Sequence, residues 1–275
     1  MANDSLEFNW DAYKESLNQL AHDVAKENHV MRPLLKLYGE QGKWARNIVR
    51  NKITADDNGP LTVSIDEQNL TPVTLSREIK VEREQFGDVN VLNRLVRDAA
   101  VQIANAEDAI ILLGNNVSGK LGAVEAKHLN KQTGLLEALS SELPKNQSVA
   151  ESVRQGITEL VHNRCVGNYA AVVSIELFTQ AKMGRQNASD TEFAEISDFL
   201  TKGFSYSPTL EGRTGVMMSL TSDGIMLAVP VDISVQLIKV EKDAFLEVVE
   251  QIRLVIDKPE AIVPLRPINN NPSVK

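Results

Sequence analysis

The sequence predicts an α+β fold built around one long helix, and three observations lead to this prediction. Apolar side chains in residues 88–113 recur at three- and four-residue steps, which places them on one helical stripe. The turn pairs Asn58-Gly59 and Asp223-Gly224 each separate two strand-like runs, as in β-hairpins. Helices and strands do not alternate as in βαβ units, so a doubly wound parallel sheet is disfavoured.

Residues 1–43 are expected to form an N-terminal helical arm. Apolar residues at helical spacing predict an amphipathic helix within 4–29, and Pro33 suits the start of a second short segment. The apolar positions of this helix are Leu6, Trp10, Tyr13, Leu17, Leu20 and Val24.

Residues 44–70 are expected to form a hairpin. Two strand-like runs, WARNIVRNKIT and LTVSIDEQ, flank the turn sequence ADDNGP. Neither run carries enough large apolar side chains for the centre of a core. We therefore expect the hairpin to lie on the surface of another structure. A short strand, VTL, follows at 73–75.

The long helix is expected to be a spine against which a sheet packs. Asp88 is a suitable N-cap because its carboxylate can accept a backbone N–H, and Gly114 suits a left-handed stop. At about 1.5 Å per residue, roughly 25 helical positions make a rod about 37 Å long. Its apolar stripe consists of Leu92, Leu95, Val96, Ala99, Ile103, Ala106, Ile110 and Leu113.

A second module is predicted after the loop-rich stretch 115–147. Ser148 is a plausible N-cap of a helix, with Glu151 three residues on. A buried strand (YAAVVSI), two short helices (ELFTQAK and TEFAEISDFLTKG) and a hairpin around Asp223-Gly224 follow, and then two further strands, DISVQLIKV and FLEVVEQIRLVI. Residues 267–275 are polar and are expected to be disordered.

Composition excludes several classes of protein. The net charge of −8 disfavours a large nucleic-acid footprint, which needs a clustered basic face. Cys165 is the single cysteine, so no intrachain disulfide can form and a cytoplasmic location is expected. The first residues lack the pattern of a signal peptide, and no apolar run reaches the roughly 18 residues that a membrane span needs.

Four sequence patterns suggest chemistry, and each has a stronger structural interpretation. Residues 114–121 approach the phosphate-binding G-x-x-x-x-G-K-[ST] loop, but Leu121 supplies no hydroxyl and a helix precedes the loop. His162 and Cys165 are close in sequence, which does not establish a catalytic pair. His22 and His29 share a helix face without a completing ligand, and the adjacent pair Glu107-Asp108 favours ion pairing or a solvated edge. No catalytic, cofactor or metal site is predicted.

Six segments, in order, resemble the encapsulins, also called linocin-type bacteriocins. The segments are VTLSRE (73–78), IANAEDAIILLG (103–114), GNYAAVVSIELFTQA (167–181), FSYSPTLEG (204–212), SDGIMLAVPVDISVQL (222–237) and KPEAIVPL (258–265). This resemblance implies the major capsid fold of tailed phages. It assigns 1–43 to the arm, 44–70 to an extended loop, 71–133 and 231–266 to a peripheral domain with its spine, and 134–230 to an axial domain.

The resemblance also implies a function without catalysis. Members of the family assemble as closed icosahedral shells around a cargo enzyme, which carries a short targeting peptide. It implies that an N-terminal helix faces the lumen and holds that peptide, here through Leu6, Phe8, Trp10, Leu17 and Leu20. It places the loop 182–189 at an axial pore, with Arg185, Gln186 and Asn187 near the opening, where repeated arginines would favour anions.

Two alternatives stay open at this point. A phage or prophage major capsid protein would share the fold and enclose DNA. A soluble nucleotide-binding enzyme would use the loop 114–121. Cargo identity, subunit number and flavin binding do not follow from the sequence.

Overall fold

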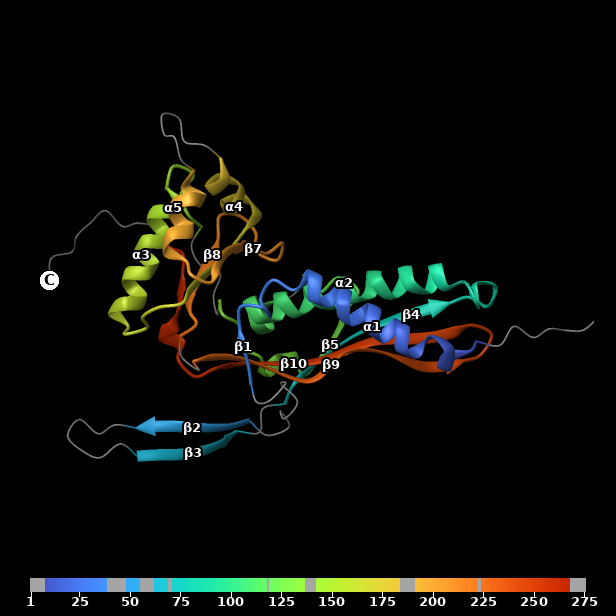
Figure 1. Ribbon diagram of the computed structural model, residues 1–275. Helices are drawn as coiled ribbons and strands as arrows, with labels where there is room; N and C mark the ends of the chain where they lie inside the picture. Colours follow the sequence, from blue (N-terminus) through green and yellow to red (C-terminus); the bar gives the residue numbers. More distant parts are fainter. Residues whose placement is uncertain are drawn as a thin grey trace, which may run out of the picture.

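Two sheets, each accompanied by helices, make up most of the computed structural model (Figure 1). The structure describes residues 8–38, 48–54, 62–68, 71–117, 119–136, 142–183, 191–221 and 224–267. The helices are α1 (Trp10–Asn28), α2 (Val89–Leu113), α3 (Val149–His162), α4 (Ile175–Lys182) and α5 (Glu192–Phe199). The strands are β1 (Lys36–Leu37), β2 (Ile48–Thr54), β3 (Thr62–Gln68), β4 (Val73–Val81), β5 (Glu125–Lys127), β6 (Tyr169–Val173), β7 (Gly203–Tyr206), β8 (Gly215–Ser219), β9 (Ile225–Val240), β10 (Ala244–Ile256) and β11 (Ile262–Pro264).

Helix α2 is the predicted spine. The Asp88 carboxylate accepts the backbone N–H groups of Asn90 and Val91, and Gly114 ends the helix with φ +58°. The predicted apolar stripe is buried at every position except Leu95, which is partly exposed. These local signals suffice because capping and amphipathic spacing both act within a few residues.

The first sheet has the order β1-β9-β10-β4-β5. Strands β9, β10 and β4 form its antiparallel centre, and β1 joins β9 in parallel. Helices α1 and α2 lie side by side along one face of this sheet (Figure 1). The apolar stripe of α2 packs on β4 and β10, and α1 packs on both α2 and β9. Burial of these faces is the main favourable term that holds the layers together.

The second sheet has the order β11-β8-β6-β7, with α3, α4 and α5 around it (Figure 1). All five residues of β6 and of β8 are buried. The predicted hairpin around Asp223-Gly224 is wrong, because β8 pairs with β6 and β11 whereas β9 belongs to the first sheet. The connection between β8 and β9 therefore crosses from one sheet to the other.

Strand β11 follows β9 and β10 of the first sheet in the chain, but it belongs to the second sheet. Residues 262–264 fall in the range 231–266 that the resemblance assigns to the peripheral domain, yet they hydrogen-bond to β8 in the second sheet. Strand β9 begins at Ile225, six residues before the expected boundary at 231. The division into domains stays a prediction, with sheet membership now known for each of these strands.

Strands β2 and β3 form the predicted hairpin ladder, with Ile48 opposite Gln68 and Thr54 opposite Thr62. Within the described ranges this two-stranded sheet pairs with neither of the other sheets. The turn at Asn58-Gly59, the docking residue Leu6, the loop 184–190 and residues 268–275 lie outside the described ranges.

Candidate functional site

A cluster of charged side chains ties the end of α1 to α2 and to the first sheet. We call it the Arg32 cluster, and it consists of His29, Arg32, Glu107, Asp108, Asp232 and Glu250. Its members come from the segment after α1, from α2, and from strands β9 and β10. The two helices and the first sheet therefore meet at one polar centre.

The guanidinium of Arg32 binds three carboxylates. Its Nε donates to Glu107 Oε1 at 3.0 Å, and one terminal nitrogen donates to Asp232 Oδ1 at 2.9 Å. The other terminal nitrogen donates to both Glu107 and Glu250. The side chains of Glu107 and Glu250 have no exposed surface, whereas that of Asp232 is half exposed. Such a planar fork of donors suits Arg, and Lys could not replace it.

Asp108 fastens the segment after α1 to the spine. Its two carboxylate oxygens accept the backbone N–H groups of Val30 and Met31, each at 2.8 Å. The ring of His29 contacts Glu107 Oε1 through Nδ1 at 3.3 Å. Since buried backbone donors need acceptors, these bonds fix how the chain leaves α1.

Burial and mutual charge set the protonation of this cluster. Burial raises the pKa of Glu250, and the neighbouring Glu107 charge raises it further. Burial also raises the pKa of Asp108 to about 7, against the lowering effect of its two backbone hydrogen bonds. Burial lowers the pKa of His29. Burial alone would also lower the pKa of Arg32, but the charges of Glu107 and Glu250 outweigh it, so the pKa of Arg32 is raised. The cluster therefore holds a cationic Arg32 and a neutral imidazole at neutral pH.

A metal ligand set is present in outline. Donor atoms of His29, Glu107 and Glu250 all lie within 4.8 Å of one another, and all three residues are buried. One nitrogen and two carboxylates suit a divalent transition metal. However, Arg32 already donates to both carboxylates, so the cation held by this arrangement is the guanidinium. We interpret the cluster as an ion-pair network.

The raised pKa of Glu250 predicts a pH-dependent stability. A carboxyl group whose pKa is higher in the folded than in the unfolded chain adds to the free energy of unfolding. This contribution is complete below the ordinary pKa of 4.5, and it is lost as the pH rises through the folded pKa. His29 acts oppositely, because its lowered pKa costs stability as pH falls below about 6.5. Glu250→Gln keeps an acceptor for Arg32 but does not titrate. We expect the Glu250→Gln variant to gain stability relative to the wild-type chain as the pH rises above 4.5.

Urea unfolding at several pH values measures this difference. The assignment is supported if the free energy of unfolding of the wild-type chain falls relative to that of the variant as the pH rises. A difference that does not change with pH contradicts it. Glu247→Gln removes a carboxylate from the same strand, β10, and is the matched control.

A pocket of about 230 Å³ opens beside the Arg32 cluster, between α1 and β9. The α1 side chains His22 and Lys26 border it, and Asp232 and Ile233 of β9 form the facing wall. His22 Nε2 lies 3.6 Å from Asp232 Oδ2 across the opening. The pocket therefore combines cationic and acidic groups at its rim with an apolar wall.

The predicted docking residues differ in their accessibility. Leu17 and Phe8 are buried in the subunit's own core, and the Phe8 ring lies 5.2 Å from that of Phe86. Trp10 and Leu20 pack against the core but stay partly exposed. Only these two of the described docking residues present surface to another molecule.

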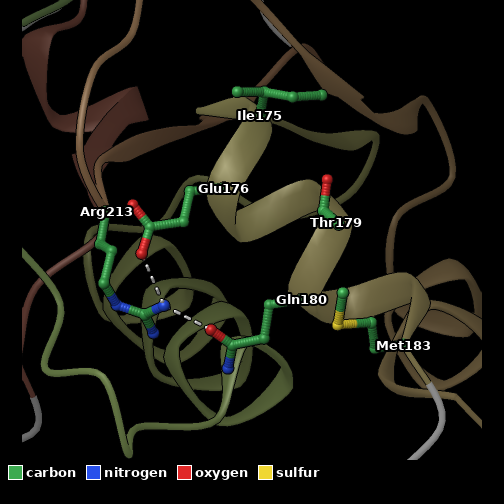
Figure 2. A pocket seen from close by; sticks show the side chains of 6 residues that line it. All are labelled: Ile175, Glu176, Thr179, Gln180, Met183 and Arg213. Atoms are coloured by element: carbon green, nitrogen blue, oxygen red, sulfur yellow. Dashed lines mark hydrogen bonds and ion pairs between the residues drawn. The ribbon is translucent and has the colours of Figure 1, made fainter.

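A groove of about 390 Å³ runs along α4 in the second part of the molecule (Figure 2). It is lined by Ile175, Glu176, Thr179, Gln180, Met183 and Arg213. Helix α4 ends at Lys182, where the predicted pore loop begins. Arg185, Gln186 and Asn187 lie outside the described ranges, so their role at a pore stays a prediction.

The loop after α2 is not arranged as a phosphate cradle. The Gly114 N–H donates to Ile110 O and the Asn115 N–H to Gln132 O at 3.0 Å, so these amides are already used. Lys120 Nζ donates to Thr209 O at 3.0 Å and also contacts Glu211. The described part of 114–121 thus fastens the end of the spine to neighbouring loops.

The His162 and Cys165 pair shows no activated thiol. Cys165 is buried, and burial followed by the charge of Glu260 raises the pKa of its thiol. His162 is exposed at the end of α3. Among the described contacts, none joins the two side chains.

None of the helices in the described ranges combines the length and apolar character that a membrane crossing requires. Residues 8–252 match the model of the family described as "Encapsulating protein for peroxidase".

Individual proteins agree with this match. The chain is 23% identical over 265 residues to the Type 1 encapsulin shell protein EncA of Myxococcus xanthus (strain DK1622), covering 90% of each chain. Its fold is similar to that of a virus-like particle from Pyrococcus furiosus, with a TM-score of 0.66, 13% identity, and coverage of 92% of this chain and 99% of that one. It is also similar to the capsid of Myoviridae Phage XM1, with a TM-score of 0.59, 14% identity, and coverage of 87% and 91%.

Proposed function

This chain belongs to the encapsulating-protein family whose model matches residues 8–252, and we propose that its copies form a closed icosahedral shell around a cargo protein in the cytoplasm. It is a self-assembling shell protein with the major capsid fold of tailed phages. The encapsulin resemblance and the α+β capsid fold predicted from the sequence are thereby confirmed. The family match over nearly the whole chain is the observation that carries the proposal.

The β2–β3 hairpin supports assembly on physical grounds. An isolated two-stranded sheet is marginally stable in water, because it lacks a partner surface for its side chains. Since β2 and β3 pair only with each other in the described part of the chain, a neighbouring subunit is the natural cover. This is the role we propose for the extended loop, 44–70.

We assign no catalytic step to the chain itself. Its family consists of shell proteins, and the buried carboxylates of Glu107 and Glu250 are engaged in ion pairs with Arg32. The chemistry of the compartment would then belong to the cargo.

We propose that cargo docks on the exposed side of α1. Trp10 and Leu20 supply partly exposed apolar surface there, whereas the pocket bordered by His22 and Lys26 opens on the other side of the helix from Leu20. A short peptide with apolar anchors fits this surface, in the manner of peptide-in-groove recognition. Leu17 and Phe8 support the helix from below rather than touching the peptide.

Native purification followed by electron microscopy tests the shell. Closed hollow particles support the proposal, and mass spectrometry of their contents identifies the cargo. A monomer or small oligomer of the wild-type chain would refute it. Particles filled with DNA instead of protein would favour the phage-capsid alternative.

Trp10→Ala combined with Leu20→Ala tests the docking surface. We expect particles of normal size in which the amount of cargo falls by about tenfold or more. The reason is that losing two apolar anchors should cost more than about 1.4 kcal/mol of binding free energy. Glu15→Ala with Gln19→Ala changes exposed polar positions of the same helix and is the control. Full cargo loading of the Trp10 and Leu20 variant would overturn this assignment while leaving the shell intact.

A further inference from the structure

Helix α4 carries an apolar ridge that the subunit leaves uncovered. Ile175 is 51% exposed and Met183 is 63% exposed. Together with Thr179 they recur at four-residue steps, so they lie on one side of the helix. We call Ile175, Thr179 and Met183 the α4 ridge. Figure 2 shows them extending from the helix, with Glu176 and Gln180 turned toward Arg213.

Arg213 fixes α4 in place and so fixes the ridge. Its guanidinium is almost fully buried and donates to Gln180 Oε1 at 2.5 Å and to Glu176 Oε1 at 3.5 Å (Figure 2). The remaining donors reach the backbone carbonyls of Leu143 at 2.8 Å, Pro144 at 3.0 Å and Gln147 at 3.5 Å. Because these bonds anchor the helix, α4 cannot easily turn to bury Ile175 and Met183. A rigid surface also loses little entropy when it binds.

The charged side chains next to the α4 ridge, Lys182 and Glu176, are engaged by other groups of the same subunit. Lys182 Nζ lies 4.7 Å from the ring centroid of Phe178 and 5.0 Å from that of Phe193, so its ammonium is directed over aromatic faces. The carboxylate of Glu176 faces Arg213. Tyr206 is 43% exposed, and its ring also lies beside Phe178, with 5.0 Å between the ring centroids. Exposed apolar surface of this kind marks an interaction site for another apolar surface.

We propose that the α4 ridge is a contact surface for a second copy of this chain within the shell. This inference rests on the proposed assembly, in which every subunit touches several copies. Helix α4 leads directly into the loop 182–189, proposed to lie at a symmetry axis, and elements that approach such an axis lie beside the copy that the axis generates. The ridge would meet a different patch on that copy, giving a head-to-tail contact that closes into a ring.

Two other occupants fit less well. The proposed cargo surface lies on α1, which packs on the first sheet, whereas α4 packs on the second. The chain's own C-terminal segment follows Arg266, whose carbonyl accepts from Gln147 Nε2 at 3.2 Å near α4. However, residues 268–275 contain only two apolar side chains, Ile268 and Val274, among polar ones. Such a segment would not bury the ridge.

A photo-crosslinker placed at Ile175 tests the contact in assembled particles. We expect a band at twice the subunit mass, and mass spectrometry should place the crosslinked residue on a second copy. The same probe at Glu27, an exposed position of α1, is the matched control and should leave a single-mass band. A chain that ends at Pro267 should crosslink equally well. If truncation abolishes the crosslink, or if wild-type particles give none, the inference is wrong.

A charged variant measures the importance of the contact. Ile175→Lys with Met183→Lys should reduce the chain recovered in closed particles by about tenfold or more, because each copy would bury unpaired charges at a repeated interface. Failure of the wild-type chain to form particles would refute the shell itself. Normal particle formation by the charged variant would refute only the role of the ridge.

Discussion

Replacing Arg32 with methionine is expected to destabilise the subunit by about 3–5 kcal/mol. Methionine fills a similar volume but leaves the buried carboxylates of Glu107 and Glu250 without their shared counter-charge. Removing one partner of a buried ion pair costs more than the pair contributes, because the remaining charge stays desolvated. Since whole domains are stable by only about 5–15 kcal/mol, a large share of the subunit's stability would be lost.

Urea unfolding monitored by tryptophan fluorescence measures this loss. Arg154→Met is the matched control, because Arg154 pairs with Glu151 and Glu195 at the surface and such pairs contribute about 1 kcal/mol or less. The double variant Arg32→Met, Glu250→Gln should recover part of the stability, since one of the two buried carboxyl groups that lose the guanidinium is gone. A single Arg32 variant as stable as the Arg154 control would show that the cluster is not a structural anchor.

Local elements were predictable because their causes are local. Asp88 and Ser148 were identified as N-caps from residue type and spacing, and both accept backbone N–H groups at those helix starts. The spine ends at Gly114 as predicted, with a left-handed φ that glycine adopts at no steric cost. In each case the interacting groups are at most four residues apart.

The hairpin at Asp223-Gly224 failed because the partner of a strand is not chosen locally. Asp-Gly is a strong turn signal, but strands on either side of a turn need not pair. β8 is buried at every position and so belongs in the centre of a sheet, where β6 and β11 flank it on both edges. Those partners lie tens of residues away in the sequence, and a pattern of alternation does not identify them.

The Arg32 cluster was missed for a related reason. Adjacent acids Glu107 and Asp108 suggested ion pairing or a solvated edge, and ion pairing was the correct half. A usable signal was present, because nearly every neighbour from 103 to 113 is apolar and such a helix is buried on all sides. Acids in that setting must be buried and paired. The sequence pattern could not identify Arg32 as the partner of Glu107, since these residues are 75 positions apart.

Replacing Gly134 with alanine is expected to destabilise the subunit by about 3 kcal/mol or more, although its backbone φ suits any residue. A Cβ at this position would lie 2.3 Å from the Gly114 nitrogen and 2.4 Å from the Leu113 carbonyl carbon. Both are backbone atoms and cannot move aside as a flexible side chain could. The segment after Gly134 would have to lift away from the end of α2.

That displacement would break the bonds that finish the spine. Leu135 N–H donates to Ile111 O at 2.9 Å, and Leu136 N–H donates to Leu112 O at 2.8 Å. These carbonyls lie in the last turn of α2, where no intrahelical donor remains for them. Leaving buried acceptors unpaired adds to the steric cost. Gly114 and Gly134 are therefore needed because two backbone segments touch, which explains the glycine-containing loop without a phosphate.

Gly122→Ala provides the sharp comparison. Gly122 has φ +60°, yet nothing lies within 4 Å of its Cβ position, so alanine there should cost only the backbone strain of about 1–2 kcal/mol. Urea unfolding should rank Gly134→Ala as the more damaging variant, opposite to the order expected from φ alone. The reverse order would mean that the segment 132–136 can shift freely. The end of the spine would then not be held by this backbone contact.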